Sequence, residues 1–137
     1  MITIGEGSLA IPAHWHNASV NIFSATSTGG LSLTVNRDRL GPGIMLADYA
    51  QQQIETLPQQ LARWVLLQQQ VLLLAEHPGH LFEFTWHAPA QGLIHQILLC
   101  TAQDATVLNF SGTHTGMMDQ QQRQQILTML TSFRFNA

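Results

Sequence analysis

The sequence predicts an α+β fold, in which a twisted antiparallel β-sheet carries two main helices on one side. Residues 19–38 contain two alternating strand patterns around a small-residue turn, and residues 63–114 contain further alternating segments joined by short turns. Two other segments have the three- and four-residue spacing of amphipathic helices. Because no linker or internal repeat interrupts this order, residues 1–137 are expected to form a single domain.

The hairpin in residues 19–38 is predicted to have two different faces, because successive side chains of a strand point to opposite sides of a sheet. One face of its second strand is apolar and belongs in a core, and consists of Leu31, Leu33 and Val35. The other face is small and polar, and consists of Ser32, Thr34 and Asn36. Val20 and Ile22 on the first strand are left open, since an apolar residue there could serve the core or an exposed groove.

The remaining elements follow in order along the chain. Residues 44–61 are predicted to form a helix, with Pro58 ending it or kinking its last turn. Residues 63–74, 81–87, 93–101 and 106–114 are predicted to be strands of an antiparallel meander, the first of them broken or bulged near its three glutamines. Asp119 is the expected N-cap of a last helix that runs through Ser132.

The composition limits which partners the protein can have. Only 9% of the residues are charged, against about 25% in an average soluble domain, and glutamine replaces much of the missing charge. The net charge of −3, with five arginines and no lysine, argues against nucleic acid and against docking on an anionic membrane. A single cysteine, no signal-peptide pattern and no run of about 20 apolar residues predict a soluble, cytoplasmic protein that does not insert into a membrane.

No catalytic or metal-binding pattern stands out. The seven histidines lack the spacing of a metal site, and His14/His16 and His77/His80 fall in predicted turns. Cys100 and His95 are an odd number of residues apart in one predicted strand, so they are expected on opposite faces. Glu83 and Glu76 are expected to be isolated carboxylates rather than an acid/base pair. We therefore expect a binding protein without enzymatic activity, cofactor or metal.

Several short motifs, taken in order, resemble the effector-associated (Eag) chaperones of bacterial type VI secretion. The first two are residues 20–23 (VNIF) and 33–38 (LTVNRD) of the hairpin. They are followed by Gly43 and a helix carrying Leu46, Tyr49 and Gln53, then by His95-Gln96 in a strand and Ser132-Phe133-Arg134 near the end. The likeness covers nearly the whole chain.

The resemblance implies a Mog1/PsbP-like fold and a homodimer that keeps the apolar N-terminal segments of a secreted toxin soluble. Implied partner-binding residues are Val20, Ile22, Ser32, Thr34, Asn36, Gln53 and Gln96. Asn36 departs from the family pattern, where a smaller serine is more usual. Two alternatives stay open: another binding module of the same fold that recognises a folded protein, and an ordinary solvated sheet face at Ser32, Thr34 and Asn36.

Overall fold

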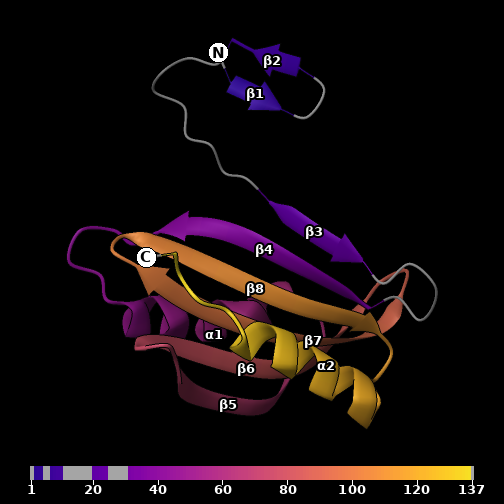
Figure 1. Cartoon of the computed structure of the whole chain (residues 1–137). Helices are drawn as coiled ribbons and strands as arrows, with labels where there is room; N and C mark the ends of the chain where they lie inside the picture. Colours follow the sequence, from indigo (N-terminus) through magenta and orange to yellow (C-terminus); the bar gives the residue numbers. More distant parts are fainter. Residues whose placement is uncertain (1, 5–6, 11–19, 25–30, 137) are drawn as a thin grey trace.

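One antiparallel sheet of six strands organises the chain, in the order β3-β4-β8-β7-β6-β5 (Figure 1). The computed structural model describes residues 2–4, 7–10, 20–24 and 31–136. The strands of the sheet are β3 (Asn21–Ser24), β4 (Ser32–Arg39), β5 (Val65–Leu74), β6 (His77–Ala88), β7 (Gly92–Gln103) and β8 (Thr106–Thr115). Near the N-terminus, β1 (Ile2–Ile4) and β2 (Gly7–Leu9) form a separate two-stranded antiparallel sheet.

The predicted hairpin is present as the antiparallel pair β3–β4, in which Ile22 lies opposite Thr34 and Phe23 opposite Leu33. Its turn lies outside the described residues. The predicted meander is confirmed as β5 to β8, and β5 contains the expected irregularity, a bulge between Leu66 and Gln68. Strands β3 and β5 are the two edges of the sheet.

The α+β class and the antiparallel sheet are confirmed, but the expectation of two helices on one side is wrong. Helix α1 (Leu46–Gln60) packs with Phe82 and Phe84, whereas helix α2 (Gln120–Thr131) packs with Leu81 and Ile97. Leu81 and Phe82 are neighbours in β6, so their side chains point to opposite faces. The helices therefore cover opposite faces, with α2 in front of the sheet and α1 behind it in Figure 1.

Each face of the sheet has a core of its own. The buried residues on the α2 side are Leu31, Val35, Leu74, Leu81, Ile97, Leu99, Phe110, Met118, Ile126 and Leu130. Those on the α1 side are Tyr49, Ala50, Phe82, Phe84, Cys100 and Val107. The apolar side of β4 thus joins the α2 core, as the alternation predicts for Leu31 and Val35. Within the described residues, neither helix is long and apolar enough to cross a membrane.

Candidate partner-binding face

The polar side of β4 lies on the same side of the sheet as α1, next to the area that the helix covers. Directly opposite residues of paired strands share a face, and Thr34 lies opposite both Ile22 of β3 and Ser111 of β8. The same argument adds Thr113 and Gln96 through Ser32. We call this surface the open face, and it consists of Ile22, Ser32, Thr34, Asn36, Gln96, Ser111 and Thr113.

The α1 core explains why the open face is not covered. Its sheet residues come from β6, β7 and β8, and none comes from β3 or from β4 itself. Ser32 and Thr34 are half-buried, Asn36 is exposed, and Ile22 is 69% exposed. The face therefore combines one exposed aliphatic side chain with a floor of small hydroxyl and amide groups.

A chain of hydrogen bonds holds the Gln96 amide in one orientation at the floor of the open face. Trp86 Nε1 donates to Gln96 Oε1, and Gln96 Nε2 donates to Ser111 Oγ at 2.9 Å. Ser111 Oγ lies 3.5 Å from Thr113 Oγ1. The indole N–H of Trp86 can only donate, so the Gln96 atom that it contacts is the amide oxygen. The atom that faces Ser111 Oγ is therefore the amide nitrogen. Gln96 is thus a rigid part of this surface.

Helix α1 borders the open face and is tied to the sheet by a second polar cluster. Tyr49 Oη donates to Asp38 Oδ2 at 2.8 Å and accepts from Asn109 Nδ2 at 2.9 Å. Burial raises the pKa of Tyr49 well above its ordinary value, and Asp38 raises it further while Asn109 opposes the shift. Gln53 is half-buried, three residues after the buried Ala50, and so lies on the sheet-facing side of the helix.

The structure also places the two residues that the sequence left open. Val20 is 53% exposed and directly precedes β3, and Ile22 belongs to the open face opposite Thr34. Neither side chain is buried in the core. Five of the seven predicted residues therefore share the open face, whereas Gln53 lies on the bordering helix α1 and Val20 lies just before β3.

Sequence reasoning missed Trp86, Ser111 and Thr113. The signal was the alternation of β8, in which Asn109, Ser111 and Thr113 on one face are polar and Leu108 and Phe110 on the other face are apolar. The same pattern in β4 had indicated the face, and the pairing of the two strands doubles its area.

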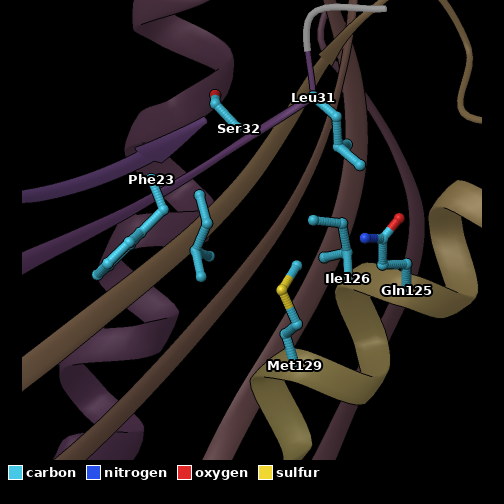
Figure 2. A pocket seen from close by; sticks show the side chains of 7 residues that line it. Phe23, Leu31, Ser32, Gln125, Ile126 and Met129 are labelled. Carbon is cyan, nitrogen blue, oxygen red and sulfur yellow. The ribbon is translucent and has the colours of Figure 1, made fainter. Parts of the chain in front are cut away.

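A separate small cavity of about 210 Å³ lies on the α2 side, between the β3–β4 pair and α2 (Figure 2). Phe23, Leu31, Ile126 and Met129 supply most of its apolar lining, and Ser32 contributes at its rim. Phe23 is 58% exposed and points away from the open face, because it alternates with Ile22 in β3. The predicted binding residues other than Ser32 do not line this cavity.

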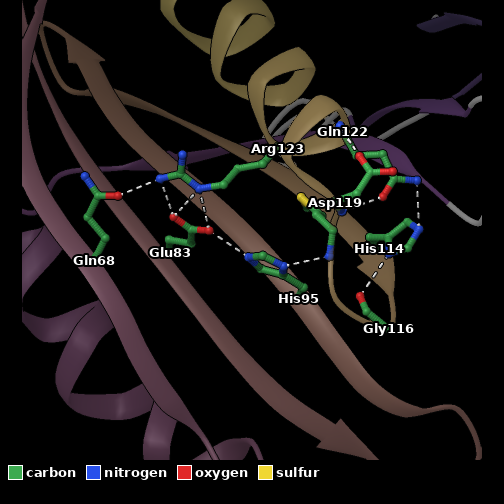
Figure 3. A network of polar contacts seen from close by, with 9 residues as sticks. Gln68, Glu83, His95, His114, Gly116, Asp119, Gln122 and Arg123 are labelled. Carbon is green, nitrogen blue, oxygen red and sulfur yellow. Dashed lines mark hydrogen bonds and ion pairs between the residues drawn. The ribbon is translucent and has the colours of Figure 1, made fainter.

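The α2 side also holds a buried ionic network, which corrects the expectation that Glu83 is isolated (Figure 3). Arg123 Nε and Nη2 donate to both carboxylate oxygens of Glu83 at 2.8–3.0 Å. The amide of Met118 donates to His95 Nδ1, so His95 Nε2 carries the proton and donates to Glu83 Oε2 at 2.7 Å. Burial alone would raise the pKa of Glu83, but the hydrogen bonds from Arg123 and His95 outweigh it and hold that pKa below its usual value.

This network ties α2 to the sheet through Arg123 and Glu83. Cys100 is fully buried on the α1 side, where burial raises the pKa of its thiol to about 12. His95 lies on the α2 side, so the expected separation of Cys100 and His95 on opposite faces is confirmed. Among the described residues, no three His, Cys, Asp or Glu side chains come close enough to hold a metal ion.

One sequence relative and one solved structure, both from Pseudomonas aeruginosa, resemble the chain. It is 27% identical over 92 residues to Effector EagT6 of strain PAO1, a match that spans 65% of this chain and 64% of that protein. The match to EagT6 confirms the sequence resemblance to the Eag group. The crystal structure of PA94, a protein of unknown function, superposes with a TM-score of 0.79 at 21% identity, covering 99% of this chain and 95% of that one.

A more distant solved structure confirms the PsbP-like fold. Cyanobacterial PsbP (CyanoP) from Synechocystis sp. PCC 6803 has a TM-score of 0.59 at 11% identity, with 93% of this chain and 99% of that chain covered. A model of the DcrB family matches residues 6–132, which is nearly the entire sequence. The chain therefore belongs to the DcrB family.

Proposed function

We propose that this protein is a chaperone that binds the apolar N-terminal helices of a type VI secretion effector and shields them before export. The name of the relative, Effector EagT6, supports an effector-associated role. The observation that carries the proposal is the open face, where Ile22, Thr34 and Gln96 meet on one surface beside α1. These residues come from separate parts of the chain.

The chemistry of this surface suits an apolar helix. Covering such a helix removes surface worth about 25 cal/mol per Å² from water, and the exposed Ile22 offers apolar area for that contact. Hydroxyl-bearing residues such as Thr34 and Ser111 are small enough for a helix backbone to come close. No residue of the open face is charged, so a bound apolar segment would not have to desolvate an ion.

Asp38 is the carboxylate of β4 on this side of the sheet, and it is already engaged. Its two oxygens accept from the Tyr49 hydroxyl and from the Arg39 amide. The neighbouring Arg37 points to the other side, where it donates to Asn21. An apolar ligand on the open face would therefore lie beside a hydrogen-bonded carboxylate at the end of the strand.

The proposal includes a cytoplasmic location and a homodimer, as the family resemblance implies. Binding in the cytoplasm would keep the effector soluble between synthesis and loading. The partner is expected to be a large protein with apolar N-terminal stretches, encoded next to this chain.

Co-expression tests the proposal. The N-terminal region of such an effector, fused to a fluorescent reporter, is produced alone, with the wild-type protein, and with Thr34→Arg. The matched control is Thr128→Arg, at an exposed threonine of α2 on the opposite side of the sheet. We expect soluble reporter with the wild type and with Thr128→Arg, and aggregation with Thr34→Arg.

Two results would contradict the chaperone role. One is a reporter that is equally soluble without this protein, and the other is a Thr34→Arg variant that protects as well as the wild type. The salt dependence of the complex distinguishes the chaperone role from the alternative, in which the protein recognises a folded partner. A complex with a folded, charged partner should weaken steeply with added salt, whereas one held by apolar contacts should not.

A further inference from the structure

The Gln96 side chain lies where the area covered by α1 ends and the open face begins. In β7, Gln96 is opposite Phe84 of β6 on one side and opposite Thr113 of β8 on the other. Phe84 is 1% exposed in the α1 core, whereas Thr113 is half-buried and belongs to the open face. A segment that binds to the open face would therefore cover the side chain of Gln96, which is itself half-buried.

Covering a primary amide has a cost unless its polar atoms are hydrogen-bonded. Before a ligand binds, water can bond to any polar atom of the open face that the chain leaves unpaired. An apolar segment removes this water and offers no polar side chain in return. The penalty for an unpaired amide at this place would thus arise only in the complex, and it would lower the affinity rather than the stability of the free protein.

Trp86 and Ser111 supply a partner for each end of the Gln96 amide. Trp86 follows Phe84 by two residues in β6, so the two side chains share a face, and its ring packs against the α1 core. The indole N–H donates to Gln96 Oε1, and Gln96 Nε2 donates to Ser111 Oγ at 2.9 Å. Buried polar groups in folded proteins generally have at least one such partner. Both ends of the amide are therefore paired before a ligand arrives.

Trp64 provides an internal comparison on the same side of the sheet. It is half-buried like Trp86 and packs against the same core, with its ring centroid 5.8 Å from that of Phe84. In the described part of the chain, Trp64 Nε1 has no hydrogen-bond partner. Of these two tryptophans, Trp86 is thus the one whose N–H reaches a polar group of the open face.

We propose that Trp86 is a positioning residue of the open face. By donating to Gln96, it allows an apolar segment to cover the amide without leaving the amide oxygen unpaired. Trp86 acts through Gln96 and needs no contact of its own with the ligand. The role depends on the proposed function, because it matters only if an apolar segment covers the open face.

A double-mutant cycle tests this role. The probe is a fluorescently labelled helix of about 20 leucine and alanine residues with a lysine at each end, titrated with each variant. Trp86→Phe should weaken binding roughly 10-fold, because Gln96 Oε1 loses its donor. Gln96→Met should also weaken binding, because the indole N–H then has no acceptor. The double variant removes both partners and should bind the probe more tightly than either single variant.

Trp64→Phe is the matched control. It should bind the probe as the wild type does, because it removes an indole N–H that bonds to no group in the described part of the chain. NMR of the indole N–H groups checks the bond in the free protein. The signal that Trp86→Phe removes should shift strongly in Gln96→Met, and the signal that Trp64→Phe removes should shift much less.

Two results would overturn the role of Trp86. One is a double variant that binds as weakly as either single variant, because the two side chains would then act independently or Gln96 would act by direct contact alone. The other is a Trp64→Phe variant that loses as much affinity as Trp86→Phe. If the wild type does not bind the probe at all, the proposed function fails together with this role. If the wild type binds and the cycle shows no coupling, the role of Trp86 fails and the proposed function stands.

Discussion

Ile22 and Phe23 offer the sharpest local test of which side of the sheet binds. They are adjacent in β3, similarly exposed at 69% and 58%, and point to opposite faces because strand side chains alternate. We expect Ile22→Asp to abolish binding of an apolar effector segment and Phe23→Asp to preserve it. Comparing the two variants therefore distinguishes the effect of a charge on the open face from the general effect of a charge on an edge strand.

The magnitude follows from the exposure of Ile22. Fully burying an isoleucine side chain contributes about 1.5–3 kcal/mol, and with 69% of it exposed, roughly 1–2 kcal/mol is available to a ligand. Placing a carboxylate in the contact adds a desolvation cost of several kcal/mol. The sum of at least about 3 kcal/mol corresponds to a more than 100-fold weaker complex for Ile22→Asp.

The assay is a titration of a fluorescently labelled apolar segment with each variant, followed by anisotropy. Thermal unfolding of both variants checks that the fold is retained. Equal affinity of Ile22→Asp and the wild type would refute the assignment of the open face. A loss confined to Phe23→Asp would instead place the ligand at the cavity on the α2 side.

The remaining predictions concern the packing of α2. Glu83→Gln should lower stability at pH 7 by roughly 2–4 kcal/mol in urea unfolding. Because the pKa of Glu83 is lowered in the folded state, its contribution to stability is fully present above the unfolded pKa of about 4.3 and is lost as the pH falls through the folded pKa. A wild-type protein whose stability does not change over this pH range would contradict the prediction. Gly112→Ala should cost about 1–3 kcal/mol, since its Cβ would lie 2.5 Å from Ile126 Cγ2. A neutral result would mean that the helix shifts freely. Asp119→Ala removes the capping box with Gln122 and should lower the melting temperature, at a cost of about 1 kcal/mol.

Alternation in single strands was enough to predict the two faces of β4. Leu31 and Val35 are buried in the α2 core as expected, and Ser32 and Thr34 point to the other side. The bulge of β5 was visible as three polar residues inside an apolar strand. These features depend on neighbours in sequence, which is why the sequence alone could predict them.

The placement of the helices and the polar networks could not be predicted in this way. β7 is buried on both faces, with Ile97 on the α2 side and Cys100 on the α1 side, so the pattern could not say where each helix packs. The Glu83–Arg123 pair joins residues 40 positions apart, and the Gln96–Ser111 bond joins residues 15 apart. Such contacts become visible only once the strands are paired.

Site-specific photocrosslinking tests the central claim most directly. A photoreactive residue is placed at position 34 on the open face, or at position 128 on α2 as the control, and the complex with the full-length effector is irradiated and mapped by mass spectrometry. The open face predicts crosslinks from position 34 to the apolar N-terminal segment of the effector. Crosslinks from position 34 to a folded domain, or crosslinks to the apolar segment mainly from position 128, would contradict it.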